Sequence, residues 1–322
     1  MSPEPAAERN NSLVSLVLYP QGNPRFRVIA LWYFCILMTV WNFVGRTVLG
    51  FEQSFLQYAV AVGTAIGVQM LLDWVDARQN DRPLRFTGSF TAFLNFLPPP
   101  IIAGSAISML LFPNERLLPF AFASTLAIGS KVIFRAPIGN GQTQHVFNPS
   151  NLGIATTLFL LPWVGHAPPY HFTNRIESQQ VMLIIPFAVL ASGIFLHWRY
   201  TGRLPLTVGW LGGFVLQAFV RSLVFGAPLH VLLVPMTGSA FVIFTLYMIP
   251  DPATTPIRPL RQFLFGLATA AVYGMLFALH VVFALMLSLV IVCATRAVIL
   301  YAIDFLSRKP EVLPVPAAVA SA

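Results

Sequence analysis

The residues best suited to chemistry lie in a polar stretch that runs from Lys131 to Gly153. Within it, Gly139 and Gly141 flank Asn140, and such glycines allow positive φ angles and a close approach of the backbone to a ligand. Further along, Asn148 and Pro149 are typical of a helix start, with Asn148 as N-cap and Pro149 in the first turn.

A helix N-terminus that faces into a membrane offers free N–H groups and a positive dipole end to a phosphate, carbonyl or carboxylate. We therefore expect this stretch to bind a cofactor. The alternative is a loop whose Gly, Pro and Asn content only makes a turn. The residues expected to bind the cofactor are Lys131, Gly139, Asn140, Gly141, His145, Asn148, Pro149, Ser150 and Asn151.

A second polar stretch, Asp251 to Arg261, follows a short apolar segment. Its prolines prevent a continuous helix. Asp251, Thr254 and Thr255 can satisfy exposed backbone groups or coordinate a cation, and Arg261 can balance the charge of a cofactor. We expect these residues to complete the cofactor site, and the alternative is that they only cap the chain.

Two apolar segments, residues 88–98 and 238–250, resemble each other: each opens with Gly-Ser, contains hydroxyl side chains and ends in proline. Paired interrupted segments in corresponding halves of a chain point to a binding site near the membrane midplane. Arg296 lies inside the last apolar segment, where an ionisable residue indicates a functional site. The alternative is that its long side chain reaches the membrane–water interface. The residues expected to line this pocket are Ser89, Thr91, Asn95, Thr237, Ser239, Thr245 and Arg296. The hydroxyl and amide groups among them could equally serve helix–helix contacts.

The composition identifies the elements that must position these residues. The chain has 322 residues, of which 57% are hydrophobic and only 9% charged, and its mean hydropathy is +0.74. A soluble protein carries about a quarter charged residues, so this pattern predicts an all-α polytopic membrane protein. The expected membrane segments are 27–48, 54–73, 87–112 (interrupted at Pro98–Pro100), 117–135, 148–164, 181–198, 204–221, 237–250, 262–279 and 281–304.

These ten segments divide into two sets of five. Because five is odd, the second set enters the membrane from the opposite face, which predicts a 5+5 inverted repeat. The expected divisions are a cytoplasmic N-terminal tail (1–26), a first repeat (27–164), a second repeat (181–304) and a cytoplasmic C-terminal tail (305–322).

The distribution of Lys and Arg predicts the orientation. Fourteen of the 19 lie on the side that carries both termini, four lie on the other side and one lies inside a segment. Cytoplasmic loops are enriched in Lys and Arg, so both termini are expected in the cytoplasm and the protein in the cell (inner) membrane. Because the chain has so few charges, its net charge of +8 reflects these loops and does not predict nucleic-acid binding.

No catalytic residues are expected. The sequence contains no nucleophile elbow, phosphate-binding loop or dinucleotide fingerprint. Cys35 and Cys293 both lie in apolar segments, so neither a disulfide nor a metal site is predicted.

The polar stretches resemble the motifs of a known membrane family. Lys131 to Asn151, ending in Phe-Asn-Pro-Ser-Asn, is similar to the signature of flavin-binding subunits: the D subunit of Rnf electron-transport complexes and the B subunit of the sodium-pumping NADH:quinone reductase (Nqr). Asp251 to Pro256, with Phe265-Gly266 beyond, resembles the Thr-Asp-Pro-x-Thr segment of that family and the start of its next helix. The chain is most similar to the UnbU group, which is associated with enediyne biosynthesis.

One departure from the family concerns the flavin. Its electron-carrying members attach FMN to a threonine in a motif like Ser-Gly-Ala-Thr. Here the corresponding loop, residues 165–180, contains Thr173 as its single threonine. Met236 to Ser239 aligns with another Ser-Gly-Ala-Thr motif of the Rnf D subunits, but its order is altered. The resemblance therefore implies a non-covalent flavin (FMN or riboflavin) or a quinone, not covalent FMN.

Three functions follow as expectations. The first is a membrane subunit of redox-linked electron or ion transfer that acts with other subunits, without catalysing a reaction alone. The second is a channel or secondary transporter for a small polar solute, which would use the same interrupted helices. The third is an accessory membrane protein of secondary-metabolite biosynthesis, which the UnbU resemblance implies.

Overall fold

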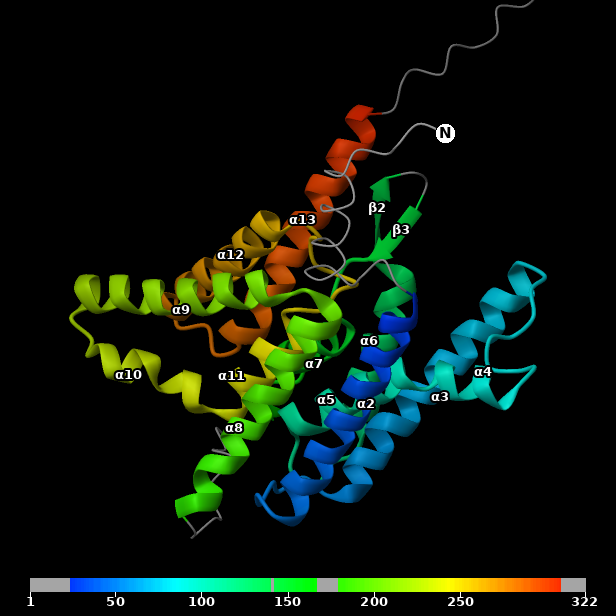
Figure 1. The fold of residues 1–322 in the computed structure, drawn as a ribbon, viewed down its shortest axis with the longest axis horizontal. Helices are drawn as coiled ribbons and strands as arrows, with labels where there is room; N and C mark the ends of the chain where they lie inside the picture. The colour runs from blue at the N-terminus through cyan, green and yellow to red at the C-terminus, as the bar shows by residue number, and fades with distance from the viewer. Residues whose placement is uncertain (1–23, 140–141, 167–178, 308–322) are drawn as a thin grey trace, which may run out of the picture.

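The computed structural model describes residues 24–139, 142–166 and 179–307, and most of them are helical (Figure 1). The helices of the first half are α2 (Pro24–Thr47), α3 (Phe55–Gln79), α4 (Phe90–Phe96), α5 (Pro98–Leu110), α6 (Leu118–Ile133) and α7 (Pro149–Leu160). Those of the second half are α8 (Gln179–Leu196), η2 (His197–Thr201), α9 (Leu204–Phe225), α10 (Leu229–Leu233), η3 (Val234–Thr237), α11 (Ser239–Ile243), η4 (Phe244–Met248), α12 (Pro259–Ala278) and α13 (Ala284–Ser307). Nearly all of both predicted tails lies outside the described residues.

The prediction of a multi-pass membrane protein is confirmed. Six helices of the described chain are long and apolar enough to cross a membrane, and one bent helix pair could form a seventh span. Their outer faces carry exposed large apolar side chains, as contact with lipid requires. The spans are Phe26–Thr47, Phe55–Gln79, Phe90–Leu110, Leu204–Phe225, Pro259–Ala278 and Ala284–Ser307.

The two interrupted segments differ in shape. In the first, Pro98 to Pro100 occupy the first turn of α5, where no backbone N–H is required, so α4 and α5 together qualify as one span. In the second, the helical parts Leu229–Thr237 and Ser239–Met248 meet at Gly238, and the bend between them is 68°. The predicted interruption is therefore a sharp bend only in the second half.

Two short antiparallel sheets qualify the all-α prediction. β2 (Arg135–Gly139) pairs with β3 (Gln142–His145), and β1 (Leu111–Phe112) pairs with β4 (Gly165–His166). The β2–β3 hairpin forms because Pro137 cannot continue α6, while pairing satisfies the backbone groups that follow. The hairpin joins α6 to α7 and carries part of the predicted cofactor stretch.

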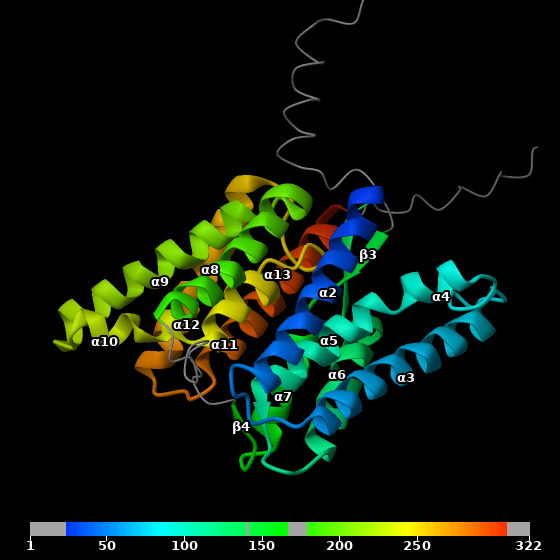
Figure 2. The ribbon, with the colours of Figure 1, turned by 60° about the horizontal axis from the view of Figure 1, so that its bottom comes forward.

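The helix pairs that pack together correspond between the halves. In the first half α3 packs on α5 and α6, and α6 packs on α7. In the second half α9 packs on α12 and on the bent pair, and α12 packs on α13. The halves meet where α2 contacts α8 and where α7 contacts α13. Figure 2 shows α3 and α4 at one end of the molecule and α9 and α10 at the other.

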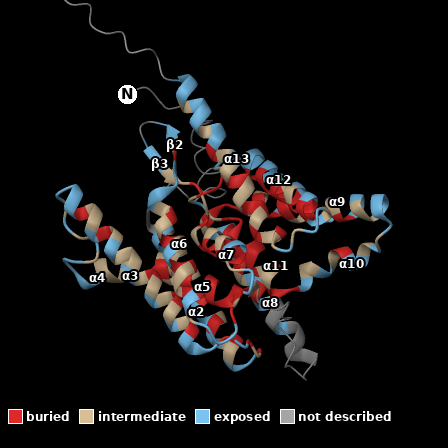
Figure 3. Ribbon diagram, turned by 180° about the vertical axis from the view of Figure 1, so that it is seen from behind, coloured by how far each residue is buried: buried red, intermediate tan, exposed pale blue. Residues whose placement is uncertain are grey.

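The buried residues gather where the two halves meet, and the outer helix faces are exposed (Figure 3). Trp210 of α9 is fully buried against Phe241, Phe244 and Tyr273. The closest approach is between α9 and α12, where a Cβ at Gly209 would lie 2.3 Å from the carbonyl oxygen of Phe263. This rigid core supports the polar loops described next.

Candidate functional site

The start of α7 forms the first wall of the candidate site. Asn148 Oδ1 accepts hydrogen bonds from the Asn151 backbone N–H at 3.0 Å and from Ser150 Oγ at 2.9 Å, and Pro149 occupies the first turn. The predicted helix start is therefore confirmed. Asn151 donates through Nδ2 to the carbonyl of Met286 in α13 at 3.0 Å, which ties α7 to the second half.

The loop between η4 and α12 forms the second wall. Asp251 shapes this loop, because its Oδ1 accepts from the Ala253 backbone N–H at 3.0 Å and its carbonyl accepts from Thr255 Oγ1 at 2.6 Å. Thr254 Oγ1 also donates to the Asp251 carbonyl, at 3.4 Å. Both threonine hydroxyls therefore hold the loop together, as the capping alternative predicts.

The two predicted polar stretches meet at Asp251. Asn148 donates through Nδ2 to the carbonyl of Met248 at 3.2 Å and to Asp251 Oδ2 at 3.4 Å. His145 Nε2, at the end of β3, lies 4.0 Å from the same carboxylate oxygen. The fold thus brings together residues about a hundred positions apart, at the junction of the two halves.

Three basic side chains surround this junction. Lys131 donates from Nζ to Gln69 Oε1 at 3.0 Å and interacts electrostatically with Asp251. Arg296 donates to the carbonyl of Thr254 at 3.1 Å. Arg203 donates to the carbonyls of Pro252, at 3.0 Å, and of Pro256. We call Lys131, Arg203, Arg296, His145 and Asp251 the basic cluster.

Burial sets the electrostatics of the cluster. Arg203 is 1% exposed, and its burial lowers the pKa to about 10, opposed by Asp251, so the guanidinium stays charged at neutral pH. Burial likewise lowers the pKa of His145, again opposed by Asp251, while Lys131, Arg135 and Arg27 lower it further. The cluster therefore combines three basic side chains and a histidine with one carboxylate.

This imbalance favours an anion. Taking a charge out of water is costly unless an opposite charge or hydrogen bonds compensate for it. Arg203 Nε is buried and has no hydrogen-bond partner among the described residues. A planar guanidinium with a free N–H is suited to a phosphate or carboxylate.

Several predicted residues surround the cluster without joining it. Gly139 adopts φ +94° in β2, where open space surrounds it. Arg261 is exposed in the first turn of α12. Asn140 and Gly141, at the tip of the hairpin, lie outside the described residues, as does Thr173 in the loop where covalent flavin was excluded.

The predicted midplane pocket is not assembled from both interrupted segments. Ser89 caps α4 by accepting from the Ala92 N–H, Thr91 is exposed, and Asn95 Oδ1 accepts from Trp32 Nε1 at 3.1 Å. Figures 1 and 2 both place α4 at the edge of the molecule, away from α11. Because α4 and α5 continue as one span, the first segment extends outward and does not bend toward the centre.

The polar side chains of the second interrupted segment are buried or hydrogen-bonded to other groups of the protein. Thr237 Oγ1 donates to the carbonyl of Val234 at 2.8 Å, and Ser239 is buried at the start of α11. Thr245 Oγ1 accepts from Trp210 Nε1 at 2.9 Å. Of the predicted pocket residues, Arg296 alone belongs to the basic cluster.

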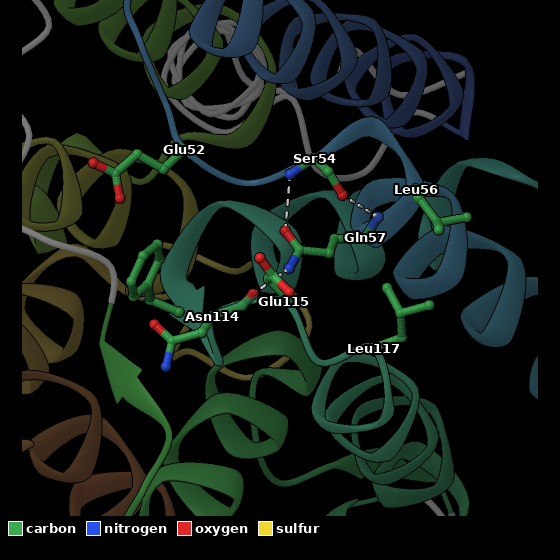
Figure 4. Close-up of a pocket in the computed structure, with 8 residues that line it drawn as sticks. Glu52, Ser54, Leu56, Gln57, Asn114, Glu115 and Leu117 are labelled. Carbon is green, nitrogen blue, oxygen red and sulfur yellow. Dashed lines mark hydrogen bonds between the residues drawn. The ribbon is translucent and has the colours of Figure 1, made fainter.

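Two surface hollows lie elsewhere in the described part of the chain. One, of about 430 Å³, lies beside the start of α3 and is lined by Glu52, Ser54, Gln57, Asn114 and Glu115 among others (Figure 4). There Gln57 closes a capping box with Ser54 and donates to the Asn114 carbonyl, so these polar groups hold the turn. The other hollow, of about 300 Å³, lies between α9 and α12. Neither is lined by a predicted site residue.

Sequence reasoning missed Arg203, Gln69 and Gln144 as members of the site. Gln144, with its amide oxygen turned toward the guanidinium, accepts from Arg296 at 2.8 and 2.9 Å. Arg203 was counted only as a loop charge, although its place directly before the apolar α9 was a usable signal. Gln69 gave no signal, because its role depends on α3 packing against α6.

Comparison with known proteins finds no matching family model and no matching curated protein. The resemblance to the Rnf and Nqr subunits therefore rests on the short motifs alone.

Proposed function

We propose that this chain is an integral membrane subunit of the Rnf/Nqr type that holds a non-covalent, phosphate-bearing flavin against the basic cluster. The observation that carries the proposal is the excess of basic over acidic side chains at the junction of the two halves, where Arg203 is buried. Arg203 Nε supports it further, because a buried donor without a partner suits an added anionic acceptor.

The roles of the residues follow from their positions. Arg203 and Arg296 would hold the phosphate, since each guanidinium presents several donors in a fixed plane. Asn148 orients the start of α7, whose free N–H groups add a positive dipole end. Asp251 keeps His145 and the loop in place. The bound flavin itself would supply electron transfer in one- or two-electron steps.

The 5+5 inverted repeat belongs to this proposal. When adjoining helices are grouped (α4 with α5, α8 with η2, and α10 through η4), each half would supply five segments in the same order, and corresponding pairs of segments pack in both halves. Contacts between the first elements, α2 and α8, and between the fifth, α7 and α13, are what a two-fold relation between halves requires. The charge distribution then orients the basic cluster and both termini toward the cytoplasm of a cell membrane, where partner subunits would bind.

The test is to purify the protein in a mild detergent, denature it with acid and record the flavin absorption and fluorescence spectra. We expect a stoichiometric amount of FMN in the wild type and a loss of at least tenfold in Arg203→Gln. Arg258→Gln is the matched control, since Arg258 is exposed beside the same loop. No flavin in the wild type would overturn the proposal, and a bound quinone in its place would replace the flavin assignment.

A transporter for a small polar solute is the second candidate, favoured by the 68° bend between Leu229–Thr237 and Ser239–Met248. Such bent helices form the substrate sites of many transporters. Uptake of labelled solutes into proteoliposomes would separate the two functions, because the redox proposal predicts no solute flux.

A further inference from the structure

The groove between α9 and α12 lies far along both helices from the basic cluster. Its walls come from Leu216, Val220, Leu267 and Met275, and small residues leave it open at Gly213, Ala271 and Gly274. α9 and α12 run in the same direction, because their contacting residues follow each other in the same order along both helices. The contacts are Gly209 with Phe263, Gly213 with Ala270 and Gln217 with Gly274. From Gly213 to Arg221 the groove therefore follows α9 for about 12 Å.

Arg221 closes one end of this apolar groove. Its guanidinium lies 4.1 Å from the centre of the Phe277 ring, and its hydrogen bond to Gln217 Oε1 is long, at 3.5 Å. Its Nε is buried and has no hydrogen-bond partner among the described residues. Arg221 thus retains donors that no protein group satisfies well.

Among the described residues, no ion pair joins Arg221 to an acidic side chain. Between Gln179 and Ser307 the sequence contains two acids: Asp251, which lies in the basic cluster near the start of α9, and Asp304, which lies in the last turn of α13. Arg221 lies one turn before the end of α9 at Phe225, where a long side chain can reach the membrane interface. A positive charge at that level attracts the phosphate of a lipid.

We propose that this groove is a binding site for one anionic phospholipid, whose acyl chain lies between α9 and α12 and whose phosphate contacts Arg221. The lining is complementary to both parts of such a lipid. The apolar walls contact the acyl chain, and Arg221 contacts the phosphate of the headgroup. A packed protein helix is a poorer match, because a volume of about 300 Å³ is at the lower limit of small-molecule sites.

The test is native mass spectrometry of the full chain after reconstitution in nanodiscs with equal phosphatidylglycerol and phosphatidylcholine, followed by gentle extraction. We expect one phosphatidylglycerol retained per wild-type chain. Ala271→Leu fills the groove from an exposed position and should reduce retention at least fivefold, whereas Ala268→Leu, also exposed on α12 but outside the lining, should not.

Two further variants separate charge from shape. Arg221→Gln should abolish the preference for phosphatidylglycerol, and Arg221→Lys should keep most of it. Equal retention of lipid in wild type, Ala271→Leu and Arg221→Gln would overturn the proposal. So would equal retention of the two lipids by the wild type, or an oligomer that Ala271→Leu disrupts, which would assign the groove to a protein partner. The thermal unfolding midpoint in detergent serves as the fold control for these variants, so the test does not depend on the proposed flavin.

Discussion

Asp251 holds the basic cluster together at the scale of single residues. It interacts with Lys131, His145 and Arg203, and it also shapes its own loop. Asp251→Asn would leave buried cations without their carboxylate, so we expect a loss of about 2 kcal/mol in unfolding free energy, between the values for exposed and buried pairs. Thermal unfolding in detergent should show a midpoint lower by about 5 °C.

The control for this change is Asp81→Asn. Asp81 is exposed and adopts φ +46°, a conformation that Asn also tolerates. Its midpoint should stay within a degree or two of the wild type. If both variants unfold at the wild-type temperature, Asp251 does not stabilise the cluster.

His145 gives the cluster a defined pH dependence. Burial lowers its pKa below the ordinary value of 6.5, so the unfolded chain binds a proton more readily than the folded one. Stability from this residue is therefore full above about pH 6.5 and is lost as the pH falls below it. We expect His145→Gln to flatten the decline in melting temperature between pH 7 and 5 relative to the wild type. An unchanged difference between pH 7 and 5 would contradict the assigned shift.

At the scale of elements, the parallel packing of α9 on α12 depends on glycine. A Cβ at Gly209 would lie 2.3 Å from the Phe263 carbonyl oxygen, whereas a Cβ at Gly212 meets open space. We expect Gly209→Ala to lower the free energy of unfolding by about 3 kcal/mol, at the upper end of the range of about 1–3 kcal/mol for overpacking. Gly212→Ala on the same helix should be neutral or stabilising by about 0.5 kcal/mol. The thermal unfolding midpoint and the yield of monodisperse protein in detergent measure the stability of each variant. Equal midpoints for the two variants would show that the contact between Gly209 and Phe263 is not tight.

The elements also show how far sequence reasoning reached. Each of the ten predicted segments overlaps helical residues, but within the described residues only six helices, or seven spans with the bent pair, are long and apolar enough to cross a membrane. Apolar composition and proline positions determine where membrane helices can form. The helix is interrupted at Leu97, directly before Pro98–Pro100, as predicted, yet α4 and α5 still qualify as one span, because proline in a first helical turn removes no needed hydrogen bond. The β2–β3 hairpin was not expected, since strand pairing depends on contacts between residues rather than on hydropathy.

The same limit applies to the site. Asn148 and Pro149 signal a helix start locally, so their role could be predicted from neighbouring residues. Arg203 joins the cluster, and Gln69 contacts Lys131, only through the packing of α9 and α3, which no local pattern encodes. The predicted pocket between residues 88–98 and 238–250 assumed that similar segments lie together, whereas α4 lies at the edge of the molecule.

At the scale of the whole molecule, the orientation in the membrane decides which partners can reach the basic cluster. Cys35 and Cys293 are buried, so replacing both with alanine leaves a background for single exposed cysteines. Gln142→Cys places a thiol on the β2–β3 hairpin, and Glu115→Cys places one at the hollow of Figure 4; both positions are exposed. Because Lys and Arg gather on the hairpin side, we expect a membrane-impermeant maleimide to label only Glu115→Cys in intact cells and both variants in lysed cells. Labelling of Gln142→Cys alone in intact cells would invert the orientation and expose the basic cluster to the outside. Labelling of both in intact cells would place the two loops on one side of the membrane and would contradict the prediction that α6 crosses it.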